Sequence, residues 1–148
     1  MVEFVYVDET GSTGRGARTQ PLLTLAAVLV PECKVQSLHS EMQEVAMTHL
    51  GYVPRDFEFH GQEVWGGRGA WSGKTAEQLI AAYEACIAIL GTLDLSIAFA
   101  SINKEDLNRR YGGSADGNAY RLALQFLMEK VDRLDSHYRV VVADESKE

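Results

Sequence analysis

The chain has 148 residues, 46% of them hydrophobic and 24% charged, which is typical of one globular domain. No apolar run reaches the ~18 residues that a membrane span requires, and the N-terminus lacks the basic leader of a signal peptide. The two cysteines, Cys33 and Cys86, form no CxxC pair. These features predict a cytoplasmic protein that has no membrane partner. The formal net charge of −7 argues against a broadly basic nucleic-acid surface, but a metal site built from acids remains compatible with it.

Hydrophobic patterning predicts an α/β protein in which helices connect the strands of a mixed sheet. The first two apolar runs are close enough to form an antiparallel hairpin, and the first, apolar on both faces, is expected at the centre of the sheet. Thr75 and Gln78 have the spacing of a capping box, and Gly51 is a candidate helix C-cap. Residues 52–73 are expected to be irregular. The predicted strands are 2–7, 22–30, 93–102 and 138–143, and the predicted helices lie near 31–51, 75–91, 103–111 and 118–134.

Two of the predicted strands end in a pair of carboxylates. Asp8 and Glu9 follow the first strand, and Asp144 and Glu145 follow the last. Because an unpaired carboxylate beside a buried strand is costly, Asp8 is expected to meet a metal ion, an arginine or backbone N–H groups. Structural roles that need no functional site are also compatible with these acids. Asp8 could cap the turn at Gly11, Asp144 could belong to a fraying chain end, and Glu9 and Glu145 could be solvated.

Glu58 and His60 form a second candidate site. Their i, i+2 spacing on an extended piece puts both side chains on one face, with Phe57 and Phe59 on the other. His60 is expected to act as a general acid/base or phosphate contact rather than as a metal ligand, because Mg²⁺ prefers oxygen. The alternative is an edge strand with a solvated polar face.

Basic residues occur in small islands within glycine-rich segments. Lys74 precedes a predicted helix as in a phosphate-binding P-loop, but the glycine required five residues before Gly73 is replaced by Arg68, so the motif fails. Trp65 and Trp71 could stack on bases or anchor their loop. The candidate phosphate contacts are Arg15, Arg18, Arg68 and Lys74, and a third island contains Arg109 and Arg110.

The segment Tyr6-Val7-Asp8-Glu9-Thr10-Gly11 resembles the YxDESG opening of domain-of-unknown-function family 3800, with threonine in place of serine. Glu58-Phe59-His60-Gly61 resembles that family's second signature, and residues 120–127 and the strand ending in Asp144-Glu145 are similar to its middle part. The resemblance implies an RNase H-like fold and a metal-dependent nuclease of bacteria and phages. It also implies two Mg²⁺ or Mn²⁺ ions held by acids of neighbouring strands.

In that interpretation Asp8 bridges the two metals, Asp144 and Glu58 complete their coordination, with Glu9 and Glu145 as further ligands, and His60 assists proton transfer. The basic loop residues position the phosphate backbone of a nucleic acid, DNA or RNA. Family members often continue past the Asp-Glu strand into further helices, so residues 1–148 are expected to form a single RNase H-like domain that is truncated, or whose C-terminal side is covered by a partner or a second copy.

Two other functions are compatible with the sequence. One is a non-catalytic interaction module of a phage or defence system that keeps the fold. The other is a metal-dependent hydrolase of a small phosphate compound, which needs no extended basic groove. Metal binding by Asp8 separates the first from both enzymes, and the choice between polymeric and free substrates separates the two enzymes.

Overall fold

The computed structural model describes residues 1–11, 20–55, 58–112, 116–134 and 138–143. The chain divides into two compact units. Unit 1 contains Met1–Glu32 and Ser96–Glu148, and unit 2 contains Cys33–Leu95. Unit 2 is therefore a continuous segment that interrupts unit 1. Within the described ranges, no helix is both long and apolar enough to cross a membrane.

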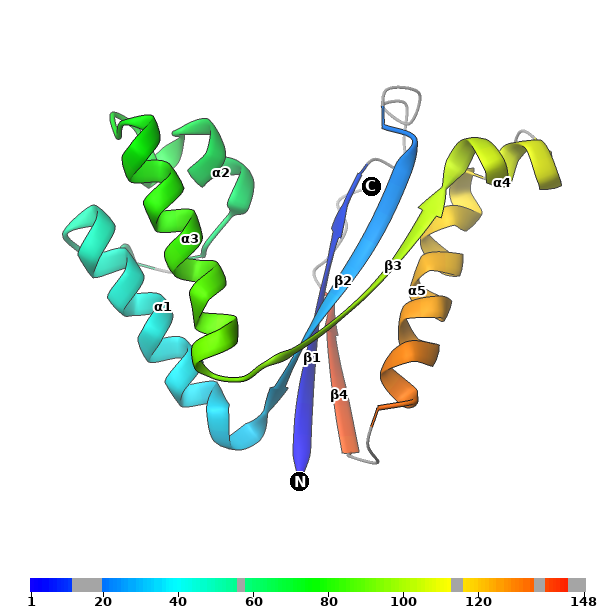
Figure 1. Ribbon diagram of the computed structural model, residues 1–148, viewed down its shortest axis with the longest axis horizontal. Coiled ribbons are helices and arrows are strands. Elements are labelled where there is room, and N and C mark those ends of the chain that lie inside the picture. Colours follow the sequence, from blue (N-terminus) through cyan, green and yellow to red (C-terminus); the bar gives the residue numbers. More distant parts are fainter. Residues whose placement is uncertain (12–19, 56–57, 113–115, 135–137, 144–148) are drawn as a thin grey trace. The chain divides into compact units, whose positions relative to one another are not determined.

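Unit 1 is built on a four-stranded sheet with the order β3-β2-β1-β4 (Figure 1). β1 pairs antiparallel with β2 and parallel with β4, while β2 pairs antiparallel with β3. The predicted N-terminal hairpin pairing and the mixed sheet are confirmed. The strands are β1 (Val2–Thr10), β2 (Leu22–Pro31), β3 (Ser96–Asn103) and β4 (Tyr138–Ala143).

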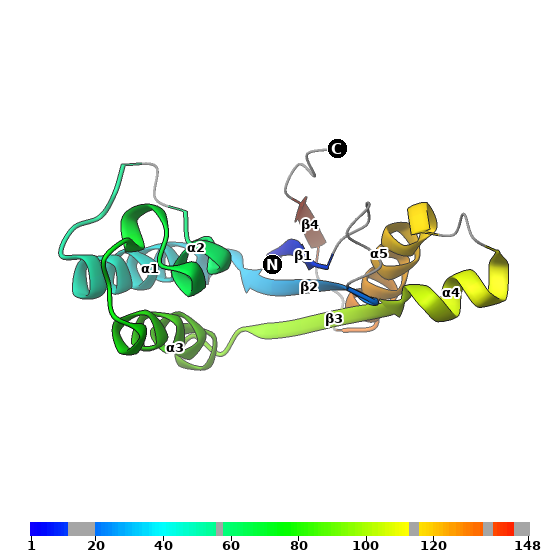
Figure 2. The same cartoon turned by 90° about the horizontal axis from the view of Figure 1, so that it is seen from above.

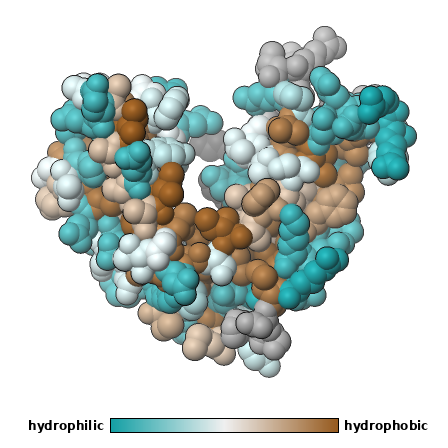
Figure 3. All heavy atoms as spheres, in the orientation of Figure 1, coloured by the Kyte–Doolittle hydropathy of each residue, from teal (hydrophilic) through white to brown (hydrophobic). Residues whose placement is uncertain are grey.

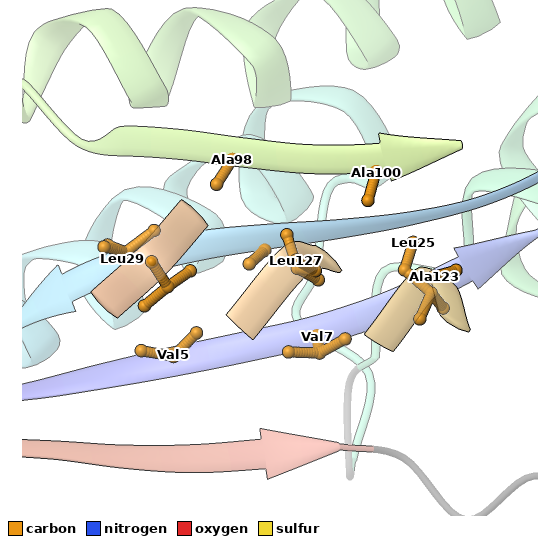
Figure 4. Packing of buried hydrophobic residues seen from close by; sticks show 10 residues of the cluster. Val5, Val7, Leu25, Leu29, Ala98, Ala100, Ala123 and Leu127 are labelled. Atoms are coloured by element: carbon orange, nitrogen blue, oxygen red, sulfur yellow. The ribbon is translucent and has the colours of Figure 1, made fainter. Parts of the chain in front are cut away.

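Helix α5 (Asp116–Asp132) covers one face of this sheet. Side chains alternate along a strand, so Val5 and Val7 of β1 point to the same face and both are buried. Ala123 and Leu127 of α5 pack against them, together with Leu25 and Leu29 of β2 and Ala98 and Ala100 of β3 (Figure 4). The small alanines let the helix approach the edge strand closely. This cluster is the core of unit 1.

The opposite face of the sheet carries exposed apolar side chains. Tyr6 of β1 is 38% exposed and Phe99 of β3 is 59% exposed. The space-filling view shows hydrophobic side chains at the surface over β3 (Figure 3). β1 is central, as expected, but the expectation that both of its faces are buried is wrong, because only the face under α5 is closed. The exposed set also includes Ile97, Val140 and Val142.

Helix α4 (Lys104–Tyr111) begins directly where β3 ends, and the chain then returns through α5 (Figure 2). Asn103 is its N-cap, and its side-chain oxygen accepts hydrogen bonds from the N–H groups of Glu105 and Asp106. The backbone N–H of Lys104 also donates to the carbonyl oxygen of Pro21, at 2.8 Å. This helix start is therefore attached to the beginning of β2.

Unit 2 consists of helices α1 (Val35–Leu50), α2 (Gly61–Gly66) and α3 (Ala76–Thr92), of which α1 and α3 lie side by side (Figure 1). The predicted C-cap at Gly51 and the capping box of Thr75 and Gln78 are both confirmed. The prediction that 52–73 is irregular throughout is wrong, because it contains α2 and a 3₁₀ turn, Gly69–Trp71. A helix of six residues is too short to show helical periodicity in its sequence.

The two cysteines, both in unit 2, are expected to differ in reactivity. Cys33 is exposed, whereas burial raises the pKa of the Cys86 thiol to about 12. Because the thiolate is the reactive form, one thiol per chain should react rapidly with a thiol reagent near pH 8, and the second, which is partly buried, much more slowly. Mass spectrometry of the labelled protein would identify Cys33 as the fast site. Rapid labelling of Cys86 in the folded chain would contradict this.

The Cys86 thiol also makes stability depend on pH. Its folded pKa lies above that of an unfolded cysteine, about 8.5, so the stabilisation is present below about pH 8.5 and is lost as the pH rises toward 12. Urea unfolding at pH 8 and pH 10 should show a smaller alkaline loss of stability in Cys86→Ala than in the wild type.

Candidate functional site

Asp8 lies inside β1 rather than after it, because β1 continues to Thr10 through pairing with β2. Its register partner is Ala26. Alternation places its side chain on the open face of the sheet, where it is exposed. The prediction that Asp8 follows the end of a buried strand is therefore wrong, because Asp8 lies within β1 and its side chain is exposed. One oxygen, Oδ1, accepts a hydrogen bond from the backbone N–H of the next residue, Glu9, at 2.8 Å. The turn that follows Gly11 lies outside the described residues.

Gly11, the last residue of the opening motif, has a conformational requirement of its own. Its φ is +105°, and a Cβ built there would lie 2.4 Å from the carbonyl oxygen of Leu22. That separation is far below any normal contact, and the obstructing atom belongs to the backbone. Only glycine fits where the chain leaves β1 this close to the start of β2. The glycine thus fixes the backbone that carries Asp8 and Glu9.

The open face is polar beside Asp8. The hydroxyl groups of Thr24 and Ser101 hydrogen-bond to each other across β2 and β3, at 2.7 Å. Thr24 is also the register partner of Thr10. These hydroxyls were missed from the sequence, because isolated threonine and serine residues in strands carry no motif. The face therefore changes from apolar at Tyr6 to polar at Thr10.

Glu9, the second acid of the opening motif, points to the face of the sheet opposite Asp8 and is half-buried. On the other side of β1, parallel pairing with β4 continues as far as Val7, whose partner is Ala143. β1 and β4 therefore run toward the same edge of the sheet. Asp144 and Glu145, like Arg15 and Arg18, lie outside the described residues.

Glu58 and His60 belong to unit 2, and their side chains meet. The Nε2 atom of His60 lies 2.8 Å from Oε2 of Glu58, with both side chains more than half exposed. Phe59 points the other way, and its ring contacts those of Trp71 and Tyr83. The predicted division into a polar pair and an anchoring aromatic is confirmed for residues 58–60, although the segment is not a strand. Phe57 lies outside the described residues.

The basic and aromatic candidates of unit 2 separate into anchored and exposed groups. Trp71 is buried in a cluster with Val64 and Ala82 and holds its loop, whereas Trp65 is 76% exposed. Arg68 reaches the carbonyl oxygen of Gln62, at 3.4 Å. Lys74 lies immediately before the Thr75 cap of α3.

Among the residues that the structure describes, no three His, Cys, Asp or Glu side chains gather into a group that could hold a metal ion. Asp8 and Glu9, the two acids of the opening motif, belong to unit 1, whereas the paired Glu58 and His60 belong to unit 2. Asp144 and Glu145, which follow β4 in the sequence, lie outside the described residues. Oxygen donors of this kind suit Mg²⁺ or Mn²⁺.

The chain matches no family model, no curated protein and no solved structure. The resemblance to domain-of-unknown-function family 3800 therefore stays a prediction.

Proposed function

We propose that the protein is a metal-dependent nuclease with an RNase H-like sheet. The observation that carries the proposal is the parallel register of β1 and β4, in which Val7 pairs with Ala143. Asp8 of β1 and Asp144, which follows β4 in the sequence and lies outside the described residues, are the next residues after this pair. Neighbouring strands lie about 4.8 Å apart, so two carboxylates leaving adjacent parallel strands in the same direction would come within reach of a shared ion.

The donor chemistry supports this site. Asp8 is exposed, and only its Oδ1 is used, in the bond to Glu9, as far as the described residues show. In the proposal Asp8 and Asp144 are the main metal ligands, and Glu9 and Glu145 are further candidates. Two divalent ions, when bound, would activate a water molecule for attack on a phosphodiester and stabilise the leaving oxygen.

The Glu58–His60 pair supplies the chemistry for proton transfer. The Nε2 atom of His60 lies 2.8 Å from Oε2 of Glu58. When Nε2 of the neutral imidazole carries the proton toward this carboxylate, Nδ1 is its basic nitrogen. A histidine held in this way can take a proton from water or return one to a leaving group. Within unit 2, Glu58 is close enough to His60 to orient the imidazole, and its role as a candidate metal ligand is based on the family resemblance alone. Arg68 and Lys74 are candidate contacts for the phosphate backbone.

The test combines metal binding with cleavage. The full chain is titrated with Mn²⁺ by calorimetry and then incubated with single- and double-stranded RNA and DNA. Asp8→Asn preserves the shape of the side chain but removes its charge, and is expected to lose Mn²⁺ binding and cleavage while its circular dichroism is unchanged. Glu105→Gln removes an exposed acid of α4 in the same unit and should behave as the wild type. Equal cleavage by Asp8→Asn and wild type would refute the proposal.

A second candidate, a non-catalytic interaction module, is favoured by the exposed apolar face of the sheet around Tyr6 and Phe99. It predicts that the wild type neither binds Mn²⁺ nor cleaves nucleic acid. The third possibility, a small-phosphate hydrolase, predicts release of phosphate or a nucleoside from a free nucleotide, without cleavage of polymers. The same set of assays separates all three.

A further inference from the structure

We infer that a pocket between α4 and α5 binds one nucleotide of the substrate strand. The choice of a nucleotide rests on the proposed nuclease function. The pocket belongs entirely to unit 1 and has a volume of about 410 Å³, within the range of about 300–1,000 Å³ that is usual for small-molecule sites. Its lining residues are Leu107, Tyr111, Asn118, Arg121, Leu122 and Gln125.

The apolar part of the lining is fixed to the sheet. Leu107 of α4 is buried and packs in one cluster with Leu23 of β2 and Ala119 of α5, and Leu122 packs against the same cluster. Because this cluster joins both helices to a central strand, the two leucines form a rigid surface. A surface of this kind suits the flat face of a nucleobase.

The polar part of the lining projects from one face of α5. Arg121 and Gln125 are four residues apart, so they are neighbours along the helix. The Nε2 atom of Gln125 donates to Oε1 of Glu129, at 2.9 Å, which orients the amide. Within the described ranges, no hydrogen bond or ion pair connects Arg121 to another residue. Its guanidinium is therefore available for a phosphate.

Tyr111 and Asn118 complete the recognition chemistry. The side chain of Tyr111, the last residue of α4, is 71% exposed and offers a ring on which a base can stack. The amide of Asn118 is exposed and can bond to a base edge. Arg110, in the last turn of α4, adds positive charge nearby. Four of the six lining side chains are polar, which suits a nucleotide better than an apolar peptide.

The pocket lies at the end of unit 1 that carries Asp8. Asn103, the cap of α4, pairs with Leu22 at the start of β2, and Thr24 of the same strand pairs with Thr10 of β1. The helix that contributes Leu107 and Tyr111 therefore starts at the edge where β1 ends. Asp8 faces the open side of the sheet and α5 covers the other side, so a strand of nucleic acid cut beside Asp8 would have to pass around this end of unit 1 to place one of its nucleotides in the pocket.

The test measures binding without catalysis. The full chain in EDTA is titrated by calorimetry with AMP, CMP, GMP and UMP, and separately with inorganic phosphate. We expect saturable binding of at least one nucleotide and weaker binding of phosphate. Arg121→Gln should weaken nucleotide binding by about 10-fold or more, since it removes a charge-assisted hydrogen bond to the phosphate. Tyr111→Ala should weaken it by about 10-fold through lost stacking.

Arg109→Gln is the control for Arg121→Gln, because Arg109 is an arginine of α4, next to the pocket in sequence, but pairs with Asp106 and does not line the pocket. It should bind nucleotide as the wild type does. Asp8→Asn should also bind normally in EDTA although it loses cleavage, so the pocket and the metal site are tested separately. The inference is overturned if no nucleotide binds saturably, if phosphate alone binds equally well, or if Arg121→Gln and Arg109→Gln have equal effects.

Discussion

Replacing Glu3 by leucine is expected to lower the free energy of unfolding by about 3 kcal/mol, because it removes the carboxylate that pairs with a largely buried arginine. Oε2 of Glu3 in β1 accepts from Nε of Arg139 in β4, at 2.8 Å, and the two side chains are only 12% and 13% exposed. The two residues are also register partners. Arg139 donates in addition to the carbonyl oxygen of Leu134. Urea unfolding followed by far-ultraviolet circular dichroism measures the loss.

A double variant separates two effects on the free energy of unfolding. One is the loss of the Glu3 carboxylate beside Arg139, and the other is the stabilisation that the ion pair itself provides. Glu3→Leu combined with Arg139→Met removes both charges, so it should be more stable than Glu3→Leu alone. The exposed pair Asp106–Arg109 is a matched control, and Arg109→Ala should change stability by less than about 1 kcal/mol. If the double variant were as unstable as the single one, the penalty would not come from the loss of the Glu3 carboxylate beside the Arg139 charge.

Replacing Leu127 by alanine is expected to cost about 2–5 kcal/mol. Leu127 is fully buried at the centre of the contact between α5 and the sheet, next to Val7 and Leu25 (Figure 4). Its removal leaves a cavity that flanking alanines, including Ala98 and Ala123, cannot fill. Chemical denaturation measured by circular dichroism gives the change directly.

The neighbouring residue provides the control for Leu127. Phe126 is 44% exposed, so Phe126→Ala should cost clearly less although it removes a larger side chain. Both tryptophans lie in unit 2, and their fluorescence therefore follows unit 2 while circular dichroism follows the whole chain. A greater loss for Phe126→Ala than for Leu127→Ala would contradict the assignment of the core.

Local patterns predicted most of the strands and helices, because each signal is contained in a few neighbouring residues. The capping box at Thr75 and Gln78 is one example. Boundaries set by partners distant in the sequence were missed. β1 extends beyond Val7 because Thr10 pairs with Thr24. β3 begins later than expected, because Lys34 donates to the carbonyl oxygens of Leu93 and Asp94 and holds the end of α3 there as a turn.

The parts of the candidate site that depend on the alternation of side chains along an extended segment could be predicted from the sequence. The parts that depend on packing between different helices could not. The spacing of Glu58 and His60 correctly predicted that their side chains share one face, and the structure adds that they are in contact. The same rule could have placed Asp8 on the open face, opposite the buried Val7. The pocket at Arg121 was missed, because its two walls come from different helices. The i, i+4 spacing of Arg121 and Gln125 was the only local signal of it.

The position of unit 2 between two paired strands has a consequence for folding. Leu29 of β2 pairs with Ser96 of β3, yet all of unit 2 lies between them in the sequence. If β2 and β3 were joined by a short turn, their pairing would be local in the sequence. Because unit 2 separates them, the pairing has a high sequence separation, which slows folding. If unit 2 folds first, it brings the two strand ends together and shortens the effective loop. Changes in the length of unit 2 should then alter the folding rate while leaving the register of the sheet unchanged.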